Sequence, residues 1–339
     1  MLSLRRVMHV GSRASVVRVK ATCLMIGVVL LFAACAGAAR STTSSVSSDA
    51  HDAVRLPATF EADRVYITPL LPDGRRLRFF SDSGGGVCIR RALVEQLGLA
   101  TRPLEERGER HSLASLPTFA APDVLPPFAR IFGPVVRDAC FEDIDGMLGM
   151  AFFADHVFTL DYGRREMWWL PGGFSTPANT PCAALGFPTD ALGVHTASYP
   201  SIDVEISGES FPMLLDTGAT LNLTPAAVEL FAGPARRAGS FIVRSVFQRW
   251  RLLHPEWPTA PGDVLAGETF DVIEVPSVRI AGQDVGPVLF AERPDSNLHD
   301  FMSSMMDRRV DGSLGGSALR YFRVVLDYPN ARACFVRGS

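Results

Sequence analysis

The sequence predicts an all-β protein that consists of two duplicated halves with only short helices. Two observations support this class: short apolar runs broken by Gly, Pro and Asp, and one series of motifs that occurs twice. The series is D-[ST]-G, then D-G-x-L-G, then L-D-Y, and it starts at Asp82 and again at Asp216. The step from the D-G aspartate to the L-D-Y aspartate is 16 residues in both copies. This repeated frame predicts two related folding units.

The first 34 residues are expected to be a targeting segment that is not part of the fold. They carry five basic residues and no acidic one, and their apolar run, 21–34, is too short for a permanent membrane span. The run ends Leu-Phe-Ala-Ala-Cys35, which resembles the lipobox of bacterial lipoproteins, although Phe32 stands where leucine is usual. This resemblance implies cleavage before Cys35 and lipidation of its thiol. The alternative is a plain secretory cleavage site, and both interpretations predict export.

Residues 35–58 are small and polar and are predicted to be a flexible tether. The chain has a formal net charge of −3, which becomes −8 when the five basic residues of the targeting segment are removed. The remaining sequence has no basic run, so neither nucleic acid nor an anionic surface is predicted as an electrostatic partner.

The two halves are predicted to span residues 59–175 and 190–339, with a Gly-, Pro- and Ala-rich boundary at 172–193. They differ in length, because the D-[ST]-G and D-G aspartates are 63 residues apart in the first half and 95 in the second. We assign the surplus to residues 236–270, which contain two of the four tryptophans. This segment is either a flap or substrate-facing hairpin, or a peripheral addition with its own small core.

Within each half the predicted elements follow from the local pattern. The segment 89–99 is predicted to be a helix because it ends in the Leu-Gly typical of a helix C-terminus, and 225–230 is its counterpart. The pairs Val94-Glu95 and Val228-Glu229 lie at matching offsets in these two segments. Strands are expected at 65–71, 76–80, 202–206, 213–215, 278–280 and 288–290.

Four cysteines remain after Cys35, and an even number in an exported chain predicts disulfide bonds. Four cysteines allow three pairings, and the internal repeat favours Cys88 with Cys140 and Cys182 with Cys334. Buried free thiols are the alternative. No C-x-x-C arrangement is present, so the sequence predicts no metal site.

The two D-[ST]-G motifs predict a pair of carboxylates, Asp82 and Asp216, brought together by the internal symmetry. Two carboxyl groups at close range cannot both ionise, so they share one proton, and such a pair can activate water. Glycine at the third motif position, Gly84 and Gly218, allows a tight turn that offers its N–H to the carboxylate. The hydroxyls of Ser83 and Thr217 can bond to the opposite loop.

These blocks together resemble the pepsin/retropepsin superfamily of aspartic proteases over about residues 60–337. The resemblance implies a bilobal pepsin-like fold built from two retropepsin-like β-barrel halves, with a cleft between the lobes. It implies an aspartic endopeptidase that is monomeric, needs no cofactor, and hydrolyses peptides or unfolded proteins. The implied roles are catalysis for Asp82 and Asp216, interlocking for Ser83 and Thr217, and a threaded loop for Gly149 and Gly315.

The chain departs from the family pattern in its first half. Three glycines, 84–86, follow Ser83 and predict a less rigid loop, and no Tyr or Trp lies between 90 and 145 to match a flap tyrosine. An inactive, peptide-binding or structural lipoprotein is therefore the alternative function.

Two further expectations follow from resemblance. Gly85 and Ala219 stand where pepsin-like enzymes carry a hydroxyl that lowers the carboxylate pKa, which implies a mildly acidic pH optimum. Ala36 after Cys35 resembles lipoproteins of the outer membrane, which face the periplasm or the cell surface.

Overall fold

The structure of the 339-residue chain, a computed structural model, describes residues 52–106, 109–140 and 144–338. The predicted targeting segment, Cys35 and most of the predicted tether lie outside these ranges. The end of that tether forms strand β1 and the start of β2, so regular structure begins earlier than expected from the sequence. Within the described ranges, no helix combines the length and apolar character needed to cross a membrane.

The first half is built on an eight-stranded sheet. Its central strands are buried on both faces, which explains the continuous apolar runs in the sequence. The order along the sheet is β2 (Ala58–Glu61), β3 (Arg64–Ile67), β4 (Phe79–Ser81), β9 (Gly146–Leu148), β5 (Cys88–Arg90), β8 (Val135–Arg137), β7 (Glu109–Ala114) and β6 (Thr101–Glu106).

The second half is built on a nine-stranded sheet and a separate pair of short strands. The order along the large sheet is β18 (Thr259–Leu265), β19 (Glu268–Val275), β22 (Val288–Arg293), β17 (Ser240–Val243), β23 (Gly312–Leu314), β14 (Glu209–Leu215), β13 (Ser201–Ile206), β20 (Val278–Ile280) and β21 (Gln283–Val285). The separate pair is β15 (Thr220–Asn222) and β16 (Arg236–Ala238).

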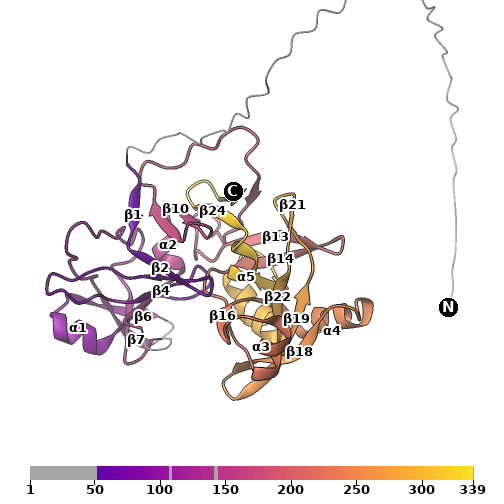
Figure 1. The fold of residues 1–339 in the computed structure, drawn as a ribbon. Coiled ribbons are helices and arrows are strands. Elements are labelled where there is room, and N and C mark those ends of the chain that lie inside the picture. The colour runs from indigo at the N-terminus through magenta and orange to yellow at the C-terminus, as the bar shows by residue number, and fades with distance from the viewer. Residues whose placement is uncertain (1–51, 107–108, 141–143, 339) are drawn as a thin grey trace, which may run out of the picture. The chain divides into compact units, whose positions relative to one another are not determined.

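A six-stranded sheet joins the two halves through the strands that carry the L-D-Y motifs. Strand β10 of the first half pairs antiparallel with β24 of the second, from Val157 opposite Asp327 to Asp161 opposite Arg323, and the two lie side by side in Figure 1. The order is β1 (Val54–Leu56), β11 (Glu166–Trp169), β10 (Val157–Asp161), β24 (Phe322–Asp327), β25 (Arg332–Arg337) and β12 (Cys182–Ala184). The hairpins β10–β11 and β24–β25 therefore occupy equivalent places on either side of the sheet's centre.

The strand pairing confirms the predicted all-β fold of two duplicated halves. In the first half, β9 pairs parallel with β4 and antiparallel with β5. In the second half, β23 pairs in the same two ways with β14 and β17. The D-G-x-L-G segment therefore lies between two strands of its own half in both copies.

The helices are short, as predicted, but only α1 and α3 correspond to the helices expected from the sequence. Helix α1 (Arg91–Leu97) ends at Gly98, whose φ of 60° explains the glycine, and α3 (Pro225–Phe231) begins with Thr224 as its N-cap. The sequence analysis missed the amphipathic α4 (Arg244–Leu253) and the π-helix η1 (Ser296–Met302). The remaining helical segments are α2 (Met150–Phe153), α5 (Gly316–Leu319) and the 3₁₀ turn η2 (Ser303–Met305).

The assignment of the length surplus to residues 236–270 was wrong. From the start of α1 to the start of β8 is 44 residues, and from α4 to β22 is also 44 residues, so these stretches correspond. The surplus instead lies in β15–α3–β16, which the chain inserts between Ala219 and Gly239, and in the segment with η1 and η2. The Gly239 N–H donates to the Ala219 carbonyl oxygen (2.9 Å), so the first insertion begins and ends at one point.

The two tryptophans of the supposed surplus belong to the main core. Trp250 is 2 % exposed and Trp257 is 8 % exposed, and both pack in the large cluster that spans the halves. The Trp250 ring lies 5.5 Å from the rings of Phe211 and Phe290, measured between centroids. A peripheral addition with its own core is therefore excluded, and β18–β19 is a hairpin of the main sheet that corresponds to β6–β7.

The predicted strands occur with shifted ends. The segments 65–71 and 76–80 form β3 and β4, which are shorter and displaced, because a turn around Gly74 takes up the residues between them. The second-half segments 202–206, 213–215 and 288–290 lie within β13, β14 and β22, and 278–280 coincides with β20. The predicted helix 89–99 starts two residues late, because Ile89 and Arg90 belong to β5.

Candidate active site

The two predicted aspartates follow equivalent strands. Asp82 comes directly after β4, and its N–H donates to the Leu148 carbonyl oxygen of β9 (3.1 Å). Asp216 comes directly after β14, and its N–H donates to the Leu314 carbonyl oxygen of β23 (3.0 Å). The backbone of each aspartate is therefore fixed to the D-G-x-L-G strand of its own half, in the same way in both copies.

The residues after the aspartates interlock across the halves. The Ser83 N–H donates to Thr217 Oγ1 and the Thr217 N–H donates to Ser83 Oγ, each at 3.0 Å. The hydroxyls donate in turn, Ser83 Oγ to the Leu215 carbonyl oxygen (2.7 Å) and Thr217 Oγ1 to the Ser81 carbonyl oxygen (3.3 Å). Both side chains are fully buried, so each hydroxyl is both donor and acceptor, and neither loop can move without breaking bonds to the other.

The glycines of the motifs are required by the opposite carboxylate. The Gly84 N–H donates to Asp82 Oδ1 (3.1 Å), and the Gly218 N–H donates to Asp216 Oδ1 (2.9 Å). A Cβ atom at Gly84 would lie 2.5 Å from Asp216 Cγ, and one at Gly218 would overlap the Asp82 carboxyl group. Each glycine thus holds the aspartate of its own half and leaves room for that of the other half.

The same close packing places the two carboxyl groups in contact, and the pKa values of both are raised, for partly different causes. Burial, followed by the charge of Asp216, raises the pKa of Asp82 well above its usual range. Burial also raises the pKa of Asp216, but the hydrogen bond with Asp82 and the N–H of Gly218 oppose the rise. The two groups are therefore coupled, and one proton shared between them fits the rise of both pKa values.

The glycine run after Asp82 is packed. The Gly85 N–H donates to the Asp82 carbonyl oxygen (3.1 Å), and a Cβ at Gly85 would overlap the Asp82 carboxylate. The Gly85 carbonyl oxygen accepts from the Met150 N–H (2.9 Å). The loop is therefore tied to α2, and glycine at 85 is needed for space, whereas Gly86 has no neighbour within 4 Å of a Cβ.

The predicted threaded glycines pass beneath these loops. A Cβ at Gly149 would overlap the Gly86 carbonyl oxygen, and one at Gly315 would overlap the Gly239 carbonyl oxygen. In the first half Gly86 directly follows the aspartate loop, whereas in the second half Gly239 follows the β15–α3–β16 insertion. The Gly315 N–H donates to Ser240 Oγ (3.0 Å), a buried contact that was not predicted from the sequence.

The aspartates of the D-G pairs hold this segment in place and lie outside the carboxylate pair. The Asp145 N–H donates to the Arg78 carbonyl oxygen and the Asp311 N–H to the Pro212 carbonyl oxygen, each at 2.8 Å. Asp145 Oδ2 also accepts from the Arg78 N–H (2.8 Å). These bonds fix the start of β9 and β23.

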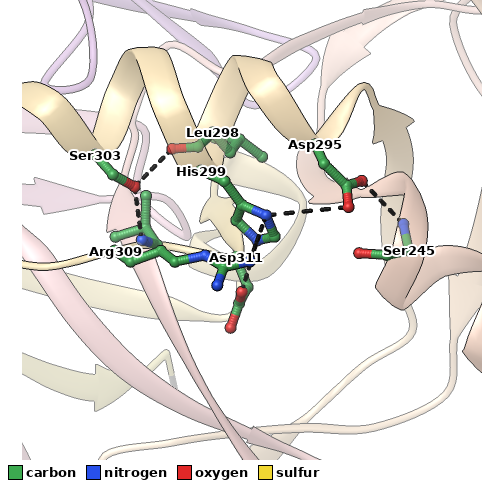
Figure 2. Close-up of polar contacts among 8 residues, drawn as sticks. Ser245, Asp295, Leu298, His299, Ser303, Arg309 and Asp311 are labelled. Atoms are coloured by element: carbon green, nitrogen blue, oxygen red, sulfur yellow. Dashed lines mark hydrogen bonds and ion pairs between the residues drawn. The ribbon is translucent and has the colours of Figure 1, made fainter.

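In the second half, η1 provides a further support for this segment. Figure 2 shows His299 on the π-helix, with its ring between Asp295 and Asp311. His299 Nε2 lies 2.9 Å from Asp311 Oδ1, and Asp295 accepts from the Ser245 N–H at the start of α4 (3.0 Å). Ser303 Oγ accepts from the Val310 N–H (2.9 Å). The second length surplus therefore braces the residues that lead into β23.

The L-D-Y aspartates act as turn residues. Asp161 Oδ1 accepts from the Arg164 N–H (2.9 Å) in the β10–β11 turn. Asp327 is fully buried and accepts from Asn330 and Arg332 in the β24–β25 turn. Neither residue is part of the carboxylate pair.

Both cysteine pairs favoured by the repeat are bonded in the structure. Cys88–Cys140 has a Cα–Cα distance of 6.1 Å, and Cys182–Cys334 has one of 4.0 Å and joins the edge strand β12 to β25. Among the residues that the structure describes, no group of three or more His, Cys, Asp or Glu side chains is placed to hold a metal ion.

The similarity of this chain to known proteins is confined to structure. No family model and no curated protein matches it. Among solved structures it is similar to the aspartic proteinase from Irpex lacteus, at a TM-score of 0.46 and 11% sequence identity, over 85% of this chain and 98% of that chain.

Proposed function

We propose that the protein is an aspartic endopeptidase that hydrolyses peptide bonds with water activated by Asp82 and Asp216. The observation that carries the proposal is the pair of carboxyl groups on duplicated turns, locked by the reciprocal bonds of Ser83 and Thr217. The coupled rise of both pKa values supports one shared proton between them. One protonated and one ionised carboxyl group supply an acid and a base at the same place.

The reaction uses both protonation states. The ionised carboxylate accepts a proton from water while the water oxygen bonds to the peptide carbonyl carbon. The protonated carboxyl group donates its proton to the carbonyl oxygen, which gives a tetrahedral diol. The proton gained from water then passes to the peptide nitrogen as the C–N bond breaks, leaving a carboxylic acid and an amine. The original division of protons is restored when the diol proton returns.

The test is hydrolysis of unfolded protein and of a peptide library by the purified protein, with and without a statine-type inhibitor. Asp82→Asn and Asp216→Asn are each expected to lower kcat by at least about 10³-fold, because neither acid nor base can be spared. Asp161→Asn is the matched control and is expected to retain activity, because Asp161 caps a turn outside the pair.

Two results would contradict the proposal. Full hydrolysis by either catalytic variant would show that the pair does not carry the reaction. A folded wild-type protein that binds peptides but cleaves none across the pH range would favour the inactive peptide-binding lipoprotein.

We also propose that the protein is exported and acts as a monomer with two lobes, 59–175 and 190–339, tethered to a membrane through a lipid on Cys35. The supporting observations are the lipobox-like sequence before Cys35 and the even number of cysteines after it. A bacterial outer membrane, facing the periplasm or the cell surface, fits the small residue that follows Cys35.

A further inference from the structure

Ser313 is a buried hydroxyl residue on the strand next to Asp216. It is the variable residue of D-G-x-L-G, in the centre of β23, and it is 1 % exposed. Strand β23 pairs parallel with β14, with Ser313 beside Leu214 and Leu314 beside Leu215. Alternate residues of a strand point to opposite faces, so Ser313 lies on the face shared by Leu214 and Asp216.

The Ser313 hydroxyl has no hydrogen-bond partner at ordinary distance among the residues that the structure describes. A buried hydroxyl without a partner is costly, so its location requires an explanation. The Ser313 hydroxyl interacts with the Asp216 carboxylate, and this interaction lowers the pKa of that group. Catalytic hydrogen bonds that are long in a free enzyme shorten when substrate is bound.

The first half has no equivalent of this hydroxyl. Met147 occupies the corresponding position of D-G-M-L-G, beside Phe80 in the same parallel register. Neither Gly85 nor Ala219 provides a hydroxyl three residues beyond its aspartate. Ser81, another buried hydroxyl without a partner, directly precedes Asp82 and therefore points to the opposite face of β4. Ser313 is thus a hydroxyl on the carboxylate face that only the second half carries at this position of the motif.

We propose that Ser313 donates a hydrogen bond to the Asp216 carboxylate and so makes Asp216 the ionised member and Asp82 the protonated member of the pair. This assignment rests on the proposed function and adds which aspartate acts as the base and which as the acid. Asp216 is the base that accepts the proton from water, and Asp82 is the acid that protonates the carbonyl oxygen. Ser313 is a positioning residue, because it acts through Asp216 and not on substrate.

Chemical labelling tests the assignment without any turnover. A small epoxide is opened by an ionised carboxylate, whereas a diazoacetyl ester takes the proton of a protonated carboxyl group and loses dinitrogen as the ester forms. Peptide mapping of the labelled full-length protein at mildly acidic pH is expected to place the epoxide on Asp216 and the diazo reagent on Asp82. Epoxide on Asp82 would overturn the inference even if the protein proves to be a protease. Epoxide on Asp216 would support it even in a protein that hydrolyses nothing.

Substitution of Ser313 provides a second test. In Ser313→Ala the acidic limb of the kcat/KM profile is expected to move up by about half a unit to one unit of pH, because one hydrogen bond to the anion is lost. Ser313→Thr keeps a hydroxyl and is expected to keep the wild-type limb. A double variant, Ser313→Met with Met147→Ser, exchanges the residues of the two halves and is expected to move the epoxide label to Asp82.

A purely structural role for Ser313 predicts different results. It would lower the thermal midpoint of Ser313→Ala but leave both the acidic limb and the labelled residue unchanged. That outcome would overturn the inference.

Discussion

At the scale of single residues, the site stores free energy that the fold has to offset. Asp82 and Asp216 are held together although burial and mutual repulsion oppose their ionisation. The reciprocal bonds of Ser83 and Thr217 fix the loops that hold them. The site persists because the surrounding sheets fix both loops. An unfavourable arrangement that the rest of the fold offsets is a common cause of a trade-off between stability and activity.

Asp82→Asn is therefore expected to stabilise the protein at neutral pH while it abolishes turnover. The pKa of Asp82 is higher in the folded state than in the unfolded state. Between these two pKa values the folded protein binds more protons than the unfolded protein, so the free energy of unfolding falls as pH rises through that window. Above this window, each unit by which the pKa of Asp82 is raised lowers the free energy of unfolding by about 1.4 kcal/mol. Asparagine does not ionise, so Asp82→Asn removes this loss. Calorimetric thermal midpoints from acidic to neutral pH measure it, with Asp161→Asn as the control. Curves for wild type and Asp82→Asn that stay parallel would contradict the prediction.

The pH dependence of hydrolysis is expected to respond to residue 219. Ala219 is 2 % exposed, and its backbone N–H donates to the Asp216 carbonyl oxygen (3.4 Å) and lowers the pKa of the Asp216 carboxyl group, but its methyl group cannot donate. In Ala219→Ser the added hydroxyl can bond to the anion, which lowers its pKa and moves the acidic limb of the pH–rate profile down by about one unit. Ala219→Gly is the control, because it adds no hydroxyl, and its acidic limb is not expected to move down. An unmoved limb in Ala219→Ser would show that other groups set the pKa.

At the scale of elements, the threaded strands β9 and β23 determine where the carboxylates lie. Each passes between two strands of its own half, and each turns out of the sheet at a glycine that touches a backbone carbonyl oxygen. The position of each aspartate thus depends on a contact between two loops that have no room for a side chain.

Gly149→Ala is expected to destabilise the protein by about 1–3 kcal/mol and to lower kcat, because the new methyl group displaces the Gly86 carbonyl oxygen and with it the Asp82 loop. Gly86→Ala is the matched control, since a Cβ at Gly86 meets no atom within 4 Å. Chemical denaturation and kcat measured on both variants give the comparison. Equal stability of the two variants would show that the loop crossing does not constrain the site.

At the scale of the whole molecule, neither half contains a complete site. The carboxylates, the interlocking hydroxyls and the L-D-Y strands each come in one copy per half, and β10 with β24 joins the halves in one sheet. Thr217 and Ser83 bond only across the halves. The proposed activity therefore requires the entire duplicated chain.

Cys35 is expected to decide where the whole molecule is located. The wild-type protein expressed in a bacterial host should fractionate with membranes and carry a lipid on Cys35, because a diacyl anchor holds a protein at a membrane. Cys35→Ser should be found in the soluble exported fraction with unchanged hydrolysis. Membrane fractionation followed by mass spectrometry of the N-terminal peptide measures both, and a Cys35→Ser variant that stays with membranes would contradict the lipid anchor.

The sequence by itself determined the class of the fold and the pair of aspartates. Strands were visible because buried strands are apolar and are bounded by Gly, Pro and Asp, and the end of α1 was visible because only glycine adopts the conformation at Gly98 easily. Asp82 and Asp216 were identified because the duplication repeats short motifs at fixed steps. Apart from the repeat itself, each of these signals lies within a few residues along the chain.

The tertiary structure decided everything that depends on pairing between distant segments. By sequence offset β15 and α3 match β5 and α1, yet β17, and not β15, lies beside β23, so the length surplus could not be located from the sequence. Local propensity also gave no sign of the π-helix that holds Asp311. In the sequence Ser313 is only the variable residue of a motif. The difference between the two carboxyl groups depends on which side chains the sheets bring to one face. Strand register decides this, and register is set by contacts between residues far apart in the chain.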